Sequence, residues 1–239
     1  MPMGLKRVRE QVVRLAGGIW QGLFPRRLEL SQEHTRLLEI IFPKVALRRV
    51  RYQVGMPWFM FRLKRVKAIT LPTTYGFTGV TVRFRSFEPY DPFYMALLVH
   101  ETVHLKQIQK TWGGIGLGMF RPFLGRYLAE HFNSSYFENP MEKDAYDFDG
   151  AFESYCRQLK RQFTRDDEAF MNEVIGQYPE HLKDPKELHE RKANAFQLIA
   201  GFALAFGMAI LRPVAELLLL LGCGLLWIFA GLLWLITWR

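Results

Sequence analysis

The feature that most constrains this chain is a helical segment in which ionisable residues stand among apolar ones. An Asp-Pro pair at positions 91 and 92 is typical of a helix N-cap and first residue, and a Gly-Gly pair at 113 and 114 ends the segment. In its middle, the run LLVHETVHL places His100, Glu101 and His104 among leucines and valines. Burying ionisable groups costs free energy unless they are paired or bind a metal. We therefore expect these three side chains to share a specific task.

The spacing of the two histidines indicates a metal site. His100 and His104 stand four residues apart, so both imidazoles lie on one helix face, one turn apart, where they can bind one Zn²⁺. Glu101 is rotated by about 100° from His100, so it can reach an attacking water without being a ligand. The sequence thus predicts two zinc ligands and a general base. The alternative is an accidental HExxH motif whose histidines are satisfied by hydrogen bonds.

A catalytic zinc takes three protein ligands and keeps one position open. Glu142 is the predicted third ligand, because it falls in the first turn of a helix capped by Asn139 and Pro140. Without the upstream motif, Glu142 would be interpreted as first-turn charge that complements the helix dipole. The other candidates for this ligand position are Asp144, Glu138 and His131.

The hydrophobic pattern around this motif predicts an α+β fold, with a first helix, a small sheet and then further helices. Helices are expected over 31–42, 91–112, 122–132, 139–161 and 164–178, the last with Thr164 and Asp167 as a capping box. Strands are expected near 50–54, 68–71 and 80–84. In the last strand apolar residues alternate with Thr81, Arg83 and Arg85, which predicts one buried and one solvated face.

Two apolar stretches near the C-terminus predict a transmembrane helical hairpin. The range 196–211 contains only Gln197 as a clearly polar residue, and 217–238 contains no charge. Arg212 and Pro213 mark the turn between them. The alternatives are a single span with 196–211 lying in the interface, or two buried core helices.

The charge pattern favours a domain that faces the cytoplasm from the inner membrane. Lysines and arginines precede the first apolar stretch and Arg239 follows the second, as the positive-inside tendency requires. We therefore divide the chain into a basic amphipathic segment (1–25), a zincin-like domain (26–180) and a membrane-anchoring region (181–239).

Composition narrows the classes of partner. The net charge of +9 is spread without a nucleic-acid-binding signature, so anionic membrane lipid is expected as a partner and nucleic acid is not. Cys156 and Cys223 are the only cysteines, which excludes a disulfide framework and a thiolate zinc site.

Several runs together resemble the bacterial HExxH metallopeptidases of the gluzincin kind. The runs are VHETVHLKQ, a Gly-rich turn, FLGRYLAEHF and NPMEKDAY, and the resemblance covers roughly 68–161. It implies zinc held by His100, His104 and Glu142, with Glu101 as base. The chain departs from the family at Asp144, which replaces a second Glu and is expected to support the ligands, and at Tyr146, where related membrane endopeptidases usually have Asp.

These observations predict a membrane-anchored, zinc-dependent metallopeptidase that hydrolyses peptide or protein substrates. Its substrate would add as a strand to 80–84, if that strand is an edge rather than an interior strand. The alternatives are a catalytically silent zinc-binding adaptor or assembly factor, and a membrane protein with an accidental motif. The candidate donors to the transition state are Tyr127, Tyr136 and His131.

Overall fold

The computed structural model describes residues 22, 24–43, 45–57, 65–72, 79–112, 127 and 138–177, and the isolated positions 199, 214, 218, 221, 222, 224 and 225. The elements of the first half are β1 (Arg26–Leu28), α2 (Gln32–Ile41), the 3-10 turn η1 (Leu47–Arg49), β2 (Val50–Val54), β3 (Ala68–Pro72) and β4 (Val80–Phe84). The helices α3 (Pro92–Trp112), α5 (Pro140–Lys160) and α6 (Asp167–Gly176) follow. This α+β arrangement was predicted from the sequence, except for the short elements β1 and η1.

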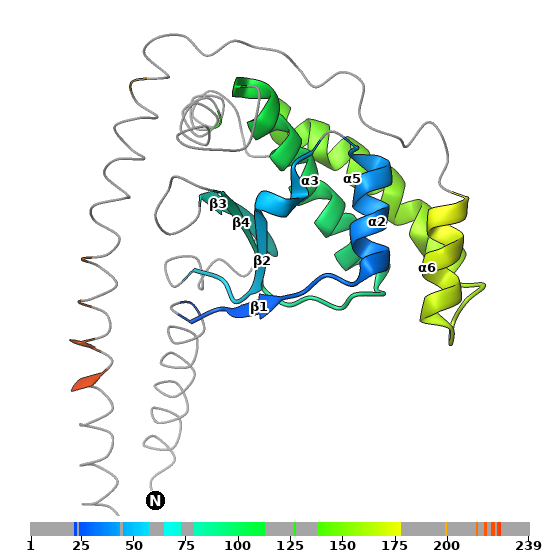
Figure 1. Ribbon diagram of the computed structural model, residues 1–239, viewed down its shortest axis with the longest axis horizontal. Helices are drawn as coiled ribbons and strands as arrows, with labels where there is room; N and C mark the ends of the chain where they lie inside the picture. Colours follow the sequence, from blue (N-terminus) through cyan, green and yellow to red (C-terminus); the bar gives the residue numbers. More distant parts are fainter. Residues whose placement is uncertain are drawn as a thin grey trace, which may run out of the picture.

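The four strands form one mixed sheet in the order β1-β2-β4-β3 (Figure 1). β2 and β4 are parallel, with Tyr52 opposite Val82, whereas β1 and β3 are antiparallel to their neighbours. β4 is therefore an interior strand, so of the two positions that the sequence left open for 80–84 the edge position was wrong. Within the described sheet the terminal strand on this side is β3.

The polar face of β4 is not solvated as the alternation predicted. Thr81 and Arg83 are 8% and 7% exposed, so both are buried, as are the apolar residues of this strand. The Arg83 guanidinium donates to the backbone oxygen of Gly22 at 2.9 Å and to the Gln53 side-chain oxygen at 3.2 Å. The chain before β1 thus reaches this face and supplies the acceptor that a buried guanidinium needs.

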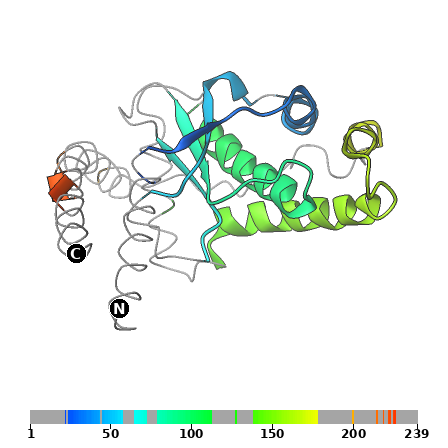
Figure 2. The same cartoon turned by 90° about the horizontal axis from the view of Figure 1, so that it is seen from below.

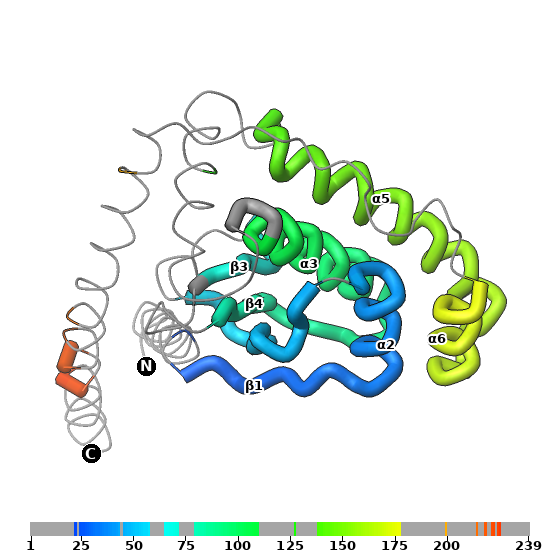
Figure 3. The backbone as a smooth tube through the Cα atoms, turned by 45° about the horizontal axis from the view of Figure 1, so that its top comes forward, coloured from blue at the N-terminus to red at the C-terminus, as the bar shows by residue number. Residues whose placement is uncertain are grey.

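Helix α3 lies between the sheet and α5, so it is covered on both sides (Figures 2 and 3). Its buried apolar residues pack toward the strands and toward α5, where Phe148 and Phe152 continue the core. Phe42, which ends α2, packs its ring 5.8 Å from that of Phe148. Because α3 is enclosed in this way, any polar side chain in its middle is held away from bulk water.

The helix boundaries follow from local capping. Ser31, Asp91 and Asn139 each accept a hydrogen bond from a backbone N–H of the first turn, as predicted. For α6 the predicted cap was wrong, because Asp166, two residues after Thr164, accepts from the N–H of Ala169 at 2.9 Å. The Asp166 carboxylate also complements the positive end of the helix dipole, which favours Asp166 over the uncharged Thr164 as the N-cap.

The predicted fold class was wrong in its transmembrane hairpin. In the described part of the chain, no helix is both long enough and apolar enough to span a bilayer. The predicted stretches 196–211 and 217–238 lie outside the described residues apart from isolated positions, as does nearly all of the predicted segment 1–25. The predicted helix at 122–132 is likewise represented only by Tyr127.

A buried histidine links α2 to the start of α3. His34 is 1% exposed, and its Nε2 lies 2.6 Å from the carbonyl oxygen of Pro89, which can only accept a hydrogen bond. Nε2 therefore carries the proton, and Nδ1 accepts from the Ser31 hydroxyl at 2.7 Å. Burial lowers the pKa of His34 from its ordinary value of 6.5. The hydrogen bond to Pro89 raises it, but by less than burial lowers it.

The lowered pKa of His34 predicts a loss of stability in acid. In the unfolded chain His34 takes up a proton near its ordinary pKa of 6.5, whereas in the folded chain it does so only at lower pH. The stability that neutral His34 contributes is therefore complete above about pH 6.5 and decreases as the pH is lowered further. We expect the difference in melting temperature between the parent and His34→Gln to shrink from about pH 7.5 to about pH 5. A difference that stays constant over this range would contradict the assignment.

Candidate metal centre

Helix α3 brings the two histidines of the motif together in the enclosed layer. His100 and His104 are 4% and 6% exposed, and their Nε2 atoms lie 3.2 Å apart. Their rings are nearly perpendicular, at an interplanar angle of 83°. The one-turn spacing thus directs one nitrogen of each imidazole to a common point.

Helix α5 supplies the third group. Asn139 caps the helix, and Glu142 in its first turn is 2% exposed. The Oε2 atom of Glu142 lies 3.5 Å from Nε2 of His100, and its Oε1 atom lies 3.5 Å from Nε2 of His104. The three candidate ligand atoms all lie within 4.8 Å of one another, so the structure brings the predicted ligand set together.

Hydrogen bonds on the far side of each ring determine which nitrogen carries a proton. Nδ1 of His100 lies 2.8 Å from the Asp149 carboxylate, which can only accept. Nδ1 of His104 lies 2.9 Å from Oε1 of Gln107, whose Nε2 donates to the carbonyl oxygen of Met141 at 2.9 Å. Both Nδ1 atoms therefore carry the proton, and in the neutral rings both Nε2 atoms present lone pairs to the cluster.

Three electron-pair donors thus meet in a buried space. The Oε2 atom of Glu142 is buried without a hydrogen-bond partner, although such atoms are nearly always satisfied. Lone pairs that face one another repel, so a cation among them would stabilise this arrangement. One divalent metal ion could satisfy all three donors at once.

The charges around the cluster also favour a cation. Burial alone would lower the pKa of His100, but the Asp149 and Glu142 carboxylates beside it outweigh this effect and raise the pKa to about 10. Burial would also raise the pKa of Glu142, but the adjacent rings of His100 and His104 hold it well below its usual range. The cluster therefore retains a carboxylate at neutral pH and attracts positive charge.

Glu101 lies beside the cluster and outside the ligand set. It is 4% exposed, and its Oε2 accepts a hydrogen bond of 2.5 Å from the hydroxyl of Thr70 on β3. The terminal strand of the described sheet therefore holds the carboxylate that sequence analysis assigned as the base. Thr70 was not predicted, because its contact with Glu101 depends on how the strand crosses the helix.

Of the predicted transition-state donors, only Tyr127 lies among the described residues, and Tyr136 and His131 do not. The Tyr127 hydroxyl donates to Oε1 of Glu142 at 2.6 Å. Burial and the nearby Glu142 carboxylate raise the pKa of Tyr127, so the phenol stays a donor. In this structure the Tyr127 hydroxyl orients the Glu142 carboxylate.

The carboxylate that contacts a candidate ligand is that of Asp149, a residue that was not predicted, whereas Asp144 was the predicted supporting acid. Asp149 follows Glu142 by seven residues, about two helical turns, so it lies on the same face of α5 and reaches His100. Asp144 is rotated by about 200° from Glu142 around the axis of α5, so the two residues do not share a helix face. Tyr146 packs its ring 4.8 Å from that of His100. The seven-residue spacing of Glu142 and Asp149 is visible in the sequence, but it identifies a partner for His100 only once the packing of α5 against α3 is known.

Comparisons with protein-family models, with curated proteins and with solved structures found no match for this chain. The assignment of the centre therefore depends on its own geometry.

The contact between Asp149 and His100 predicts an effect on metal affinity. Asp149→Asn removes the carboxylate that orients the imidazole, and we expect zinc affinity to fall by about 10- to 100-fold. Asp147→Asn is the matched control, because Asp147 is an exposed aspartate on the same helix. Competition with a chelating dye measures both, and equal affinities of the two variants would remove Asp149 from the metal centre.

Proposed function

We propose that this protein is a zinc-dependent metallopeptidase that hydrolyses peptide bonds with Glu101 as general base. The observation that supports the proposal most is that His100, His104 and Glu142 bring three buried electron-pair donors to one point. The proton positions fixed by Asp149 and Gln107 turn a lone pair of each histidine toward that point.

The donor set agrees with zinc chemistry. Two imidazoles and one carboxylate are a known ligand set of hydrolytic zinc enzymes, whereas calcium and magnesium prefer oxygen ligands. When bound, zinc supplies a Lewis acid that polarises the scissile carbonyl and lowers the pKa of the attacking water toward about 7. The unsatisfied Oε2 of Glu142 is the atom with most to gain from this ion.

Glu101 is equipped to accept the proton of the attacking water. Its Oε2 is occupied by the Thr70 hydroxyl, which leaves Oε1 to receive the proton. Holding one oxygen fixes the orientation of the carboxylate before the substrate arrives, which lowers the cost of reaching the reactive geometry. Later the same oxygen can deliver the proton to the leaving amine.

Strand β3 offers a way to align a substrate. It is the terminal strand of the described sheet, and an extended peptide can pair with the backbone of such a strand. Because Thr70 lies in the middle of β3, a peptide aligned on this strand would pass close to Glu101. Substrates in this proposal are therefore segments of polypeptide in extended conformation.

Zinc content and hydrolysis together test the proposal. We expect about one zinc per chain in the parent and in Glu101→Gln, and loss of zinc in Glu142→Ala. Hydrolysis of unfolded casein or of a peptide library should fall by about 100- to 10,000-fold in Glu101→Gln, because the general base is removed. Glu168→Gln, a change of the same kind at an exposed position of α6, should leave both unchanged.

Three outcomes would contradict parts of this account. Zinc in the parent without hydrolysis of any peptide would replace the peptidase with a zinc-binding adaptor. Equal hydrolysis by the parent and Glu101→Gln would remove Glu101 as base. A parent free of zinc after gentle purification would overturn the metal centre itself.

A further inference from the structure

Strand β3 turns the backbone groups of alternate residues away from β4. The backbone N–H of Arg85 donates to the carbonyl oxygen of Lys67 at 2.8 Å, so these two residues form a hydrogen-bonded pair next to the two strands. In an antiparallel ladder such pairs alternate with pairs whose N–H and C=O groups point away from the partner strand. Ile69 and Leu71 therefore pair with β4. Thr70 directs its N–H and C=O toward the side on which the described sheet has no further strand.

The proline at the end of β3 agrees with this direction. Pro72 lies opposite Val80, and it belongs to the same alternate set of residues as Thr70. Proline has no N–H, so within a sheet it occurs where that group would face away from the neighbouring strand. Thr70 is therefore the last residue of β3 that can offer both an N–H and a C=O to a strand added on this side.

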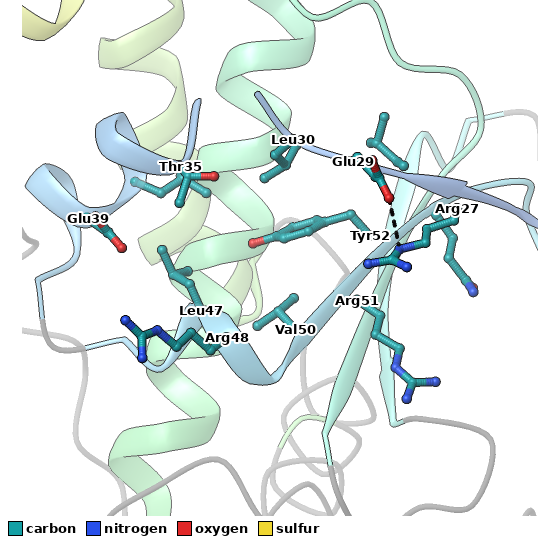
Figure 4. Close-up of a pocket in the computed structure, with 13 residues that line it drawn as sticks. Arg27, Glu29, Leu30, Thr35, Glu39, Leu47, Arg48, Val50, Arg51 and Tyr52 are labelled. Carbon is teal, nitrogen blue, oxygen red and sulfur yellow. Dashed lines mark ion pairs between the residues drawn. The ribbon is translucent and has the colours of Figure 1, made fainter. Parts of the chain in front are cut away.

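The side chain of Thr70 points to the core face of the sheet. Thr70 lies opposite Val82, which lies opposite Tyr52. Figure 4, a close-up of a hollow lined by residues of β1, α2, η1 and β2, shows the side chains of Arg51 and Tyr52 leaving β2 on opposite sides. Tyr52 and Val82 are buried, so their side is the one that α3 covers. On this side the Thr70 hydroxyl donates to Glu101 of α3 at 2.5 Å.

Thr70 thus has a backbone that an extended peptide can pair with and a hydroxyl that holds the proposed base. Threonine is branched at Cβ, so it has few χ1 rotamers and its hydroxyl closely follows the orientation of its backbone. A peptide paired with β3 would hold the strand on its second side. Such pairing would therefore also restrict the Thr70 hydroxyl and, through it, the Glu101 carboxylate.

We propose that Thr70 is a positioning residue that couples the alignment of the substrate to the orientation of Glu101. This role rests on the proposed zinc peptidase, and it adds a requirement on the substrate, which must supply a backbone N–H and C=O beside Thr70. Part of the binding energy of this pairing is used to orient the base, so it raises kcat as well as lowering KM. Substrates are thus extended peptides without proline at that position.

Steady-state hydrolysis by the zinc-loaded full chain tests the coupling. The substrate is a fluorogenic peptide from a casein sequence that the parent cleaves, together with copies that are N-methylated at each residue in turn. In the parent, N-methylation at one position away from the scissile bond should lower kcat by about tenfold, because it removes the hydrogen bond to the Thr70 carbonyl. In Thr70→Val, which lacks the hydroxyl, kcat with the unmethylated peptide should fall by about the same factor. Methylation at that position should then raise KM without a further change in kcat.

Two further variants separate this role from a structural one. Thr70→Ser keeps a hydroxyl, so it should retain most of kcat and of the methylation effect. Thr164→Val makes the same change as Thr70→Val at an exposed position between α5 and α6, and it should behave as the parent does. Zinc content should stay at about one per chain in all of them, because Thr70 is not among the candidate ligands.

An equal kcat of the parent and Thr70→Val, or a methylation effect on kcat that is the same in both, would overturn the coupling and leave the proposed peptidase intact. Loss of zinc in Thr70→Val would also overturn it, because Thr70 would then be needed to build the metal centre. A parent that holds zinc but cleaves no peptide would overturn the peptidase itself, and the coupling with it.

Discussion

The packing of α5 against α3 is the interaction on which the rest of the site depends. It brings Glu142 within 3.5 Å of both histidines of α3 and buries all three groups. The same contact brings Asp149 to His100 and lets Gln107 join His104 to the backbone of α5. Assembling the core therefore also fixes the position and the proton of each candidate ligand.

This arrangement costs stability unless it serves a purpose. A buried carboxylate oxygen without a partner and two facing lone pairs are unfavourable in a low-dielectric interior. Natural proteins keep such groups where a cation or a reaction compensates for them. The raised pKa of His100 reflects the same demand for positive charge. The unfavourable contacts of the cluster and its proposed affinity for a metal ion thus follow from one geometry.

What the sequence could predict was local. The caps at Ser31, Asp91 and Asn139 and the one-turn spacing of the histidines involve neighbours along the chain, so they were readable without a structure. The contacts of Thr70 and Asp149, in contrast, join elements that are distant in the sequence. β1 was missed because its three residues show no alternation.

The central claim is that the two histidines and Glu142 bind one metal ion. X-ray absorption at the zinc edge of the zinc-loaded full chain tests it most directly, because it reports the atoms bound to the metal. The account predicts a nearest shell of nitrogen and oxygen at about 2.0–2.1 Å, with the outer-shell scattering of two imidazoles, which is lost together with the zinc in Glu142→Ala. A chain that retains no zinc, or a zinc shell without imidazole scattering, would contradict it.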